Sequence, residues 1–363
     1  MIVLSGSIGR LVLGLVLGGA LTVISWRLAF LINVPLAVVC FLVARRHVPE
    51  SCDQTMGGHP DVLGSVLGAL GLAGLTAALV EAPGRGAGDP VVLAAGIVGV
   101  LALAGFVVLQ TRQHDPLVPP DVFADRTFVV ANLLTFVVYA ALGGVMMLFV
   151  MQLQVSLGYS PTVSGISGLP ITIILLLLSA RSGRLAQRFG PRPFLVAGPI
   201  VIALGMLLLT RVAPGASYLG SVLPAVTVFG LGLACVVAPV TATVLASAED
   251  RHAGVASGVN NAVARTGGLL AVAVLPAIAG LTGNSYTDPT ALTAGWRIAM
   301  WVCAGLCVLG GLLALGIRND VLAAEPAVAE VPESPRPGEC FHCGVEGPPV
   351  HVEPVHNVRR SAA

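Results

Sequence analysis

The sequence contains few charged residues. Of its 363 residues only 10% are Asp, Glu, Lys or Arg, whereas 56% are hydrophobic, and the mean hydropathy is +0.92. A soluble domain usually has about 25% charged residues, so this chain has too few to cover a surface that faces water alone. The shortage of charge excludes an ordinary soluble protein and predicts an integral membrane protein.

Several other features are missing. Lysine is absent, so all 19 basic residues are arginine, and with 18 acidic residues the net charge is +1. A charge so near zero gives no reason to expect a nucleic-acid partner. We find no catalytic triad, phosphate-binding loop or nucleotide motif, so we expect neither an enzyme nor a cofactor. The seven cysteines do not form the pattern of a secreted disulfide protein.

What the sequence does contain is long apolar runs. A helix needs about 20 apolar residues to cross a bilayer, and the runs are too continuous for barrel strands, which alternate every second residue. We therefore predict an all-α membrane fold of about ten helices. The expected spans are 2–24, 28–45, 61–81, 90–110, 128–153, 163–182, 194–211, 218–240, 254–281 and 296–317.

Arginine is unevenly distributed among the connecting segments. The segments after every second expected helix hold most of it, including Arg45, Arg46 and four residues within 181–192. By the positive-inside rule these segments are cytoplasmic, which places both termini in the cytoplasm. We expect the membrane to be a plasma membrane, the inner membrane in bacteria. The tail 319–363 is rich in Pro, Glu and Val and is expected to be disordered.

The segment GRLAQRFGPR, at 183–192, has two glycines and three arginines in ten residues. We expect a tight basic loop on the cytoplasmic side, where its cations favour helix C-termini and anionic lipid. The segment resembles the G-x-L-a-D-r-x-G-r-r loop of the major facilitator superfamily. Gln187 stands at the position where that loop usually has an acidic residue. The candidate motif residues are Gly183, Arg184, Leu185, Arg188, Gly190 and Arg192.

A second resemblance lies at the start of the chain. GLVLGG, at 14–19, is similar to the end of the antiporter motif of drug:proton antiporters, and SWRLAFLINVP, at 25–35, is similar to the segment that follows it. The segments 253–276 and 294–319 resemble the last two helices of the fourteen-helix branch of these antiporters. The residues that carry the first resemblance, as motif and helix-packing positions, are Gly14, Gly18, Gly19, Trp26, Arg27, Asn33 and Pro35.

These resemblances imply the major facilitator fold in a chain truncated at its N-terminus, without the first four helices of the branch. Residues 1–45 would be the last two helices of the N-terminal half, and 46–127 two inserted helices with cytoplasmic linkers. Residues 128–318 would form the C-terminal six-helix half, followed by the tail 319–363.

The implied function is efflux of small amphipathic molecules in exchange for protons, by alternating access. The implied partners are the lipid bilayer, a small-molecule substrate and protons, together with a second copy or a separate N-terminal half. The alternative is a transport-inactive fragment or membrane scaffold that lacks the proton-coupling helices.

Polar residues inside the expected helices are few. Ser257, Asn261 and Arg265 recur every fourth residue and share one helix face, with Asn260 beside them. This stripe is a candidate transport pathway or gate; an interhelical clasp, or an arginine that reaches toward the membrane surface, remains open. Asn132 and Gln152 are expected to hydrogen-bond across the bundle or to touch substrate, with packing favoured.

Three further groups of residues are considered as functional candidates: the acidic residues, the glycine pairs and the cysteines of the tail. No acid falls in the middle of an expected helix, and Glu81 is expected at a membrane interface. The pairs Gly14 and Gly18, Gly64 and Gly68, and Gly254 and Gly258 have the spacing of close helix packing. In the tail, Cys340 and Cys343 form half of a zinc motif at most, so we expect no metal site.

Overall fold

A computed structural model describes Arg27, Leu31 and residues 33–47, 61–86, 88–113, 120–248 and 252–322. All regular elements in these residues are helices. Eight of the helical segments are long and apolar enough to cross a membrane by their length and composition. The prediction of an all-helical membrane fold is confirmed, and the expected span 2–24 lies outside the described residues.

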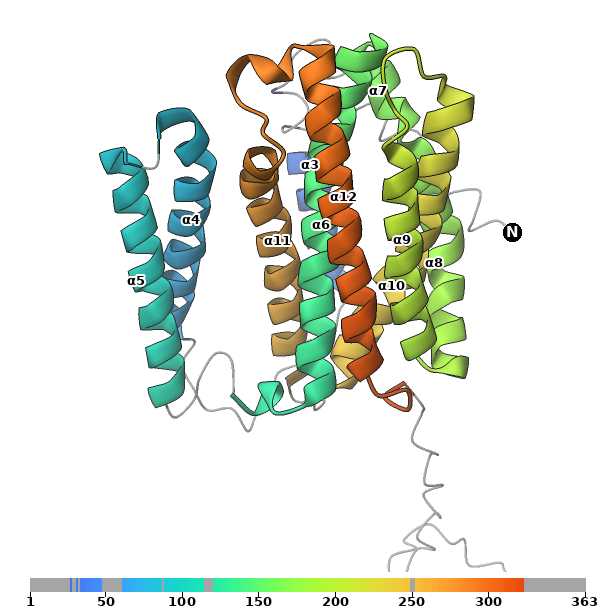
Figure 1. The fold of residues 1–363 in the computed structure, drawn as a ribbon. Helices are drawn as coiled ribbons and strands as arrows, with labels where there is room; N and C mark the ends of the chain where they lie inside the picture. The colour runs from blue at the N-terminus through green and yellow to red at the C-terminus, as the bar shows by residue number, and fades with distance from the viewer. Residues whose placement is uncertain are drawn as a thin grey trace, which may run out of the picture. The chain divides into compact units, whose positions relative to one another are not determined.

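The first described helices are α3 (Asn33–His47), α4 (Val62–Arg85) and α5 (Pro90–Arg112). Helices α4 and α5 pack side by side as a hairpin (Figure 1). At the end of the hairpin away from its turn, Gln110 Nε2 of α5 donates a 2.7 Å hydrogen bond to a carboxylate oxygen of Asp61. Most other side chains of this hairpin are partly or fully exposed, as expected for helices that face lipid.

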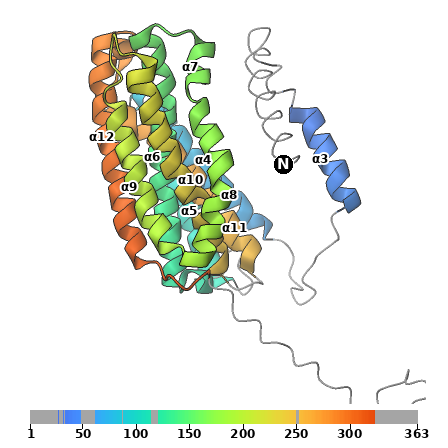
Figure 2. The same ribbon diagram turned by 90° about the vertical axis from the view of Figure 1, so that its right-hand side faces the viewer.

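The remaining helices form a six-helix bundle (Figures 1 and 2), in which we count α7 and α8 as one crossing. Helix α6 contacts α11 and α12, α10 contacts α8 and α9, and α12 contacts α9. The helices are α6 (Arg126–Leu157), α7 (Pro161–Ser167), α8 (Leu169–Phe189), α9 (Arg192–Leu209), α10 (Leu223–Ala246), α11 (Ala253–Ile278) and α12 (Pro289–Leu313).

Short helical turns complete the described chain. Three are 3₁₀ turns: η1 (Pro120–Phe123) precedes α6, η4 (Gly283–Tyr286) precedes α12, and η5 (Ala314–Gly316) follows it. The π-helical turn η2 (Tyr218–Val222) leads directly into α10. Of these turns, η2 and η5 fall within the expected spans 218–240 and 296–317, whereas η1 and η4 lie in connecting segments.

Two helix boundaries differ from the prediction for identifiable reasons. The expected span 163–182 is interrupted at Gly168, because Pro170 has no backbone N–H to continue the hydrogen bonding of α7. Helix α12 begins at Pro289, seven residues before the expected 296. The Asp288 carboxylate accepts bonds from the N–H groups of Thr290 and Ala291 and so caps a polar first turn that the apolar run did not reveal.

The bundle is held together by fully buried large side chains from four helices. They include Phe128 of α6, Met206 of α9, Phe229 of α10 and Trp296 of α12. The Trp296 indole donates a 2.9 Å hydrogen bond to the carbonyl oxygen of Leu209. Between helices in lipid the hydrophobic effect is weak, so close packing and such hydrogen bonds carry the association.

Candidate functional site

A cavity of about 660 Å³ opens between three helices of the bundle, α6, α10 and α11. Helix α11 supplies most of its wall, with α6 and α10 on the other sides. Its lining residues are Tyr139, Leu142, Gly143, Met146, Thr241, Val244, Leu245, Ser257, Asn260, Asn261, Ala264, Arg265, Gly268, Leu269 and Val272. The volume is within the range of small-molecule binding sites.

The structure brings the whole polar stripe of α11 to this cavity. Ser257, Asn260, Asn261 and Arg265 all line it, and their spacing of three to four residues gives them one face of the helix. Asn260 is buried, whereas the other three side chains are exposed. The stripe therefore presents exposed hydrogen-bonding side chains to the cavity.

The opposite walls of the cavity add polar groups that we had not predicted. Tyr139 comes from α6 and Thr241 from α10. Nothing in the spacing of α6 or α10 marks these two residues, because only the packing of the three helices brings them to the stripe. Together the walls combine hydrogen-bonding groups with apolar surface, as sites for amphipathic ligands do.

Helices α6 and α11 cross closely beside the cavity. A methyl group added to Gly143 would lie 2.8 Å from the Cα of Gly268, and one added to Gly267 would lie 2.6 Å from the carbonyl oxygen of Phe136. Both distances are too short for a real side chain, so these glycines set the separation of the two backbones. Gly143 and Gly268 also line the cavity.

The expected loop at 183–192 is wrong, because the structure has a helix over most of it. Helix α8 continues to Phe189, so only Gly190 and Pro191 separate it from α9. Leu185, Ala186 and Gln187 have good helix propensity, and no helix-breaking residue occurs between Gly183 and Gly190. Gly190 has φ = +86°, a conformation that favours glycine. Arg184, Leu185, Arg188 and Arg192 are exposed around this turn.

Asn319, just after α12, closes the turn between α8 and α9. Its Nδ2 donates a 3.1 Å hydrogen bond to the carbonyl oxygen of Phe189, and its Oδ1 accepts a 3.3 Å bond from the backbone N–H of Arg192. The Asn319 side chain thereby provides a hydrogen-bond partner for a backbone carbonyl at the end of α8 and for a backbone N–H at the start of α9. The sequence motif shows the two glycines, but the distant asparagine that fixes the turn was missed.

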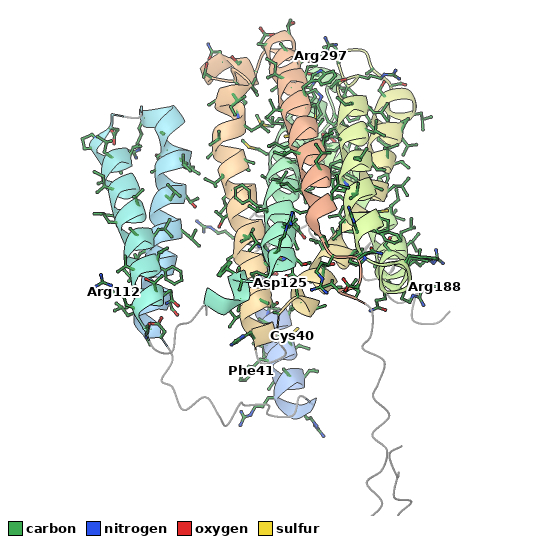
Figure 3. The ribbon with its side chains drawn as sticks, turned by 60° about the horizontal axis from the view of Figure 1, so that its bottom comes forward. Cys40, Phe41, Arg112, Asp125, Arg188 and Arg297 are labelled. Carbon is green, nitrogen blue, oxygen red and sulfur yellow. The ribbon has the colours of Figure 1, made fainter. Side chains whose placement is uncertain are left out.

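The arginines of the bundle gather mainly at one end. Arg126, Arg188, Arg192 and Arg318 lie at what we call the Arg-rich end, at the start of α6, the α8–α9 turn and the end of α12. Figure 3 shows Asp125 and Arg188 there, and Arg297 at the opposite end. This asymmetry agrees with the distribution of arginine from which we predicted the orientation.

At the end opposite the Arg-rich end, three side chains form a group that we call the polar clasp: Gln152 and Ser156 of α6, and Thr293 of α12. Gln152 Nε2 donates to the carbonyl oxygen of Val212 at 2.9 Å and to Thr293 Oγ1 at 3.0 Å. The Thr293 hydroxyl donates to the carbonyl oxygen of Pro289, so its oxygen also accepts from Ser156 at 3.0 Å. The prediction that Gln152 bonds across the bundle is confirmed.

Asn132 does not share this role. Its Nδ2 donates a 2.9 Å hydrogen bond to the carbonyl oxygen of Phe128, one turn earlier in the same helix. The prediction of a bond across the bundle is therefore wrong for Asn132. Its backbone carbonyl partner lies four residues back, which is the local competition typical of short polar side chains in helices.

We expect Gln152→Leu to lower the free energy of unfolding by about 1–2 kcal/mol, because it leaves the buried Val212 carbonyl without its donor. The matched control is Gln154→Leu on the same helix, whose side chain is only half-buried and which we expect to be nearly neutral. Titration with sodium dodecyl sulfate in mixed micelles measures both. Equal effects of the two substitutions would show that the polar clasp adds nothing to the free energy of unfolding.

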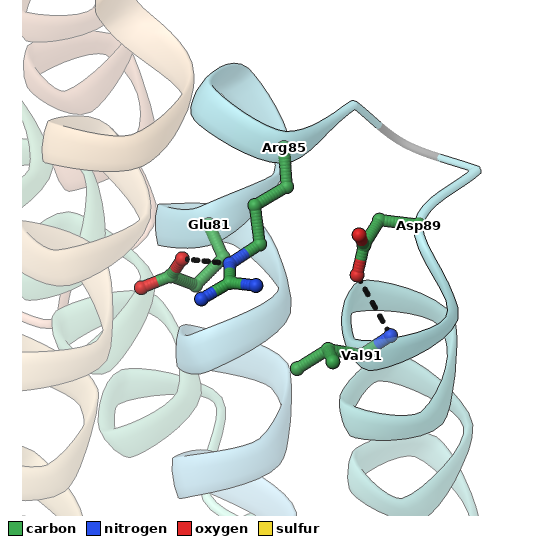
Figure 4. Close-up of polar contacts among 4 residues, drawn as sticks. All are labelled: Glu81, Arg85, Asp89 and Val91. Atoms are coloured by element: carbon green, nitrogen blue, oxygen red, sulfur yellow. Dashed lines mark hydrogen bonds and ion pairs between the residues drawn. The ribbon is translucent and has the colours of Figure 1, made fainter.

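Most described carboxylates cap helices. The side chains of Asp61, Asp89, Asp125 and Asp288 accept hydrogen bonds from the first backbone N–H groups of α4, α5, α6 and α12. Figure 4 shows the cap that Asp89 makes with Val91 N–H, and the ion pair of Glu81 with Arg85 at 2.7 Å. The four aspartates thus cap helix N-termini, where negative charge is favourable.

Glu81 is about half exposed, and so is its partner Arg85. We expect Glu81→Gln to cost no more than about 0.5 kcal/mol of stability, because an exposed i,i+4 pair contributes little. Any transport activity should remain near that of the unmodified chain, and Arg85→Gln serves as the matched control. A large loss of transport in Glu81→Gln with unchanged stability would instead make Glu81 a coupling residue.

Other sequence candidates lie at or beyond the edges of the described residues. Gly14, Gly18, Gly19 and Trp26 lie outside them, as do Cys340 and Cys343. Arg27 is helical and exposed. Asn33 begins α3, and Pro35 lies in its first turn, where the missing N–H of proline costs nothing. In the described part of the chain, no group of three His, Cys, Asp or Glu residues is arranged to hold a metal ion.

The sequence matches a family model described as Major Facilitator Superfamily, over residues 1–272 and 132–350. Among curated proteins it is 31% identical to a puromycin resistance protein of Streptomyces alboniger over 344 residues, which cover 90% of this chain and 68% of that protein. It is 30% identical to a cephamycin export protein of Amycolatopsis lactamdurans over 315 residues, covering 86% of this chain and 63% of that protein.

A third relative is an uncharacterised transporter of the same type from Mycobacterium tuberculosis, 28% identical over 340 residues, with 88% of this chain and 63% of the relative covered. The chain thus spans 63–68% of the length of these three relatives.

Proposed function

Because the chain belongs to the Major Facilitator Superfamily, we propose that it exports small amphipathic molecules across a plasma membrane by alternating access. The observation that carries the proposal is the cavity of about 660 Å³ with its polar stripe on α11. Transporters of this type bind substrate near the middle of the bilayer, between two half-bundles that rock against each other. Two relatives named for antibiotic resistance or export support the same function.

In this proposal the six-helix bundle is one of the two half-bundles of such a transporter. The second half-bundle comes from a longer form of the protein, from a separate chain, or from a second copy. The helical hairpin of α4 and α5 corresponds to the two inserted helices of the fourteen-helix branch. The Arg-rich end faces the cytoplasm, which places both termini there.

We assign protons as the exchanged ion, on the resemblance to drug:proton antiporters. Proton coupling needs a carboxyl group that alternates between charged and neutral forms in a low-dielectric site. The cavity lining contains no acid among the residues that the structure describes. The proton-carrying carboxylate therefore belongs, in this proposal, to the half-bundle that faces this cavity.

Filling the cavity tests the proposal. Ala264 lines it, whereas Val274, two turns or more along α11, is 39% exposed and does not. We expect Ala264→Trp to reduce the movement of the fluorescent dye dansylglycine across the vesicle membrane to the level of vesicles without the protein. Val274→Trp should transport as the unmodified chain does. Absence of dye movement by the unmodified, correctly folded chain would support the inactive fragment or scaffold instead.

A further inference from the structure

The cavity has an unusual charge balance for a site that handles amphipathic molecules. Arg265 is the one charged side chain among its lining residues that the structure describes. The described carboxylates are elsewhere, at helix ends and in short turns. Within the described chain, no acid forms an ion pair with Arg265. Its positive charge is therefore available to a ligand.

Arg265 is also deep within the helix. It lies twelve residues after Ala253 and thirteen before Ile278, the two ends of α11. At about 1.5 Å per residue it is roughly 18 Å from either end. A charge held so far from both ends is costly in a membrane and usually faces a cavity or a partner. Here it faces the cavity, which the Tyr139 phenol also lines.

Neighbouring groups extend this cation into a binding surface for an oxyanion. The guanidinium presents N–H donors in a plane that matches the two oxygens of a carboxylate. Asn261 and Ser257 continue the same face with an amide and a hydroxyl that can donate hydrogen bonds. Leu142, Met146 and others supply the apolar surface that the body of an amphipathic molecule requires.

We propose that this cavity selects amphipathic molecules that carry a carboxylate or a similar planar oxyanion, which Arg265 binds, over the corresponding neutral and amine compounds. The inference rests on the proposed function, since it concerns the substrate class of the same site. Arg265 is then the residue that determines specificity on this half of the transporter. A lysine in its place would keep the charge but lose the two-point geometry.

The test measures binding by the full chain in nanodiscs of phosphatidylcholine, which has no net charge to compete for Arg265. The probes are dansylglycine, its neutral amide dansylglycinamide, and the amine dansylcadaverine, with empty nanodiscs subtracted. We expect dansylglycine to bind about ten-fold more tightly than the other two, as one charge-assisted contact allows. Arg265→Gln should abolish this preference by weakening the binding of dansylglycine about ten-fold, and Arg265→Lys should be intermediate.

Arg211→Gln is the matched control, because it removes the same charge from an exposed arginine outside the cavity. It should leave all three affinities unchanged. Equal binding of the three probes, or a preference for dansylglycine that survives Arg265→Gln, would overturn the inference while leaving the proposed function intact. No saturable binding of any probe would overturn the proposed function itself, and this inference with it.

Discussion

Gly143→Ala is expected to force α6 and α11 apart and to lower the free energy of unfolding by about 1–3 kcal/mol. The added methyl carbon would lie 2.8 Å from both the Cα and the carbonyl oxygen of Gly268. Those are backbone atoms, so no rotation of a side chain relieves the contact. The helices must separate instead, and much of the packing of their faces is lost with them.

Gly268→Ala is the control from the other side of the same crossing. The nearest atom to a methyl group there is the carbonyl oxygen of Tyr139 at 3.7 Å, an ordinary contact distance. We therefore expect no loss, and a gain of up to about 1 kcal/mol from the better helix propensity of alanine. Titration with sodium dodecyl sulfate compares the two variants. Equal destabilisation would mean that the crossing is looser than the structure describes.

The same crossing shows why spacing alone pointed to Gly254 and Gly258 on α11 and missed Gly143. Gly254 and Gly258 have the small-xxx-small pattern, yet a methyl group on either would meet no atom within 4 Å among those described. The pattern says that a helix has a smooth face, but it does not say which neighbour covers that face. Gly143 meets Gly268 because two particular helices cross there, and that follows from tertiary packing.

The helices themselves could be predicted well, because membrane spanning depends on length and hydropathy. The expected 194–211 and 90–110 correspond closely to α9 and α5. Errors arose where polar residues continue a helix beyond the apolar run. The start of α12 is such a case, although Asp288 followed by Pro289 is a recognisable helix start that we did not use.

Half of the candidate site could be predicted from the helical periodicity of the sequence. Ser257, Asn261 and Arg265 are on one helix, so helical periodicity alone places them on one face. Tyr139 and Thr241 complete the cavity from two other helices. They are separated from the stripe by many residues of sequence, and no local pattern relates them to it.

The turn between α8 and α9 provides the second large expected effect, in Gly190→Ala. The backbone at Gly190 has φ = +86° and ψ = 157°, a region that is essentially restricted to glycine and that costs an alanine about 1–2 kcal/mol. A methyl group there would also collide with the side-chain amide of Asn319. Displacing that amide breaks its bonds to Phe189 and Arg192, so we expect a total loss of about 2–3 kcal/mol of stability.

Asn319→Ala separates these two causes. Alone, it removes the two hydrogen bonds that close the turn and should cost about 1 kcal/mol, because the site is exposed. In the double variant the collision is gone and only the backbone strain remains. Gly190→Ala should therefore cost less in the Asn319→Ala background than in the unmodified chain, and the difference is the coupling energy. Strictly additive losses would show that Asn319 does not reach the turn, and that the positive φ alone requires glycine at this position.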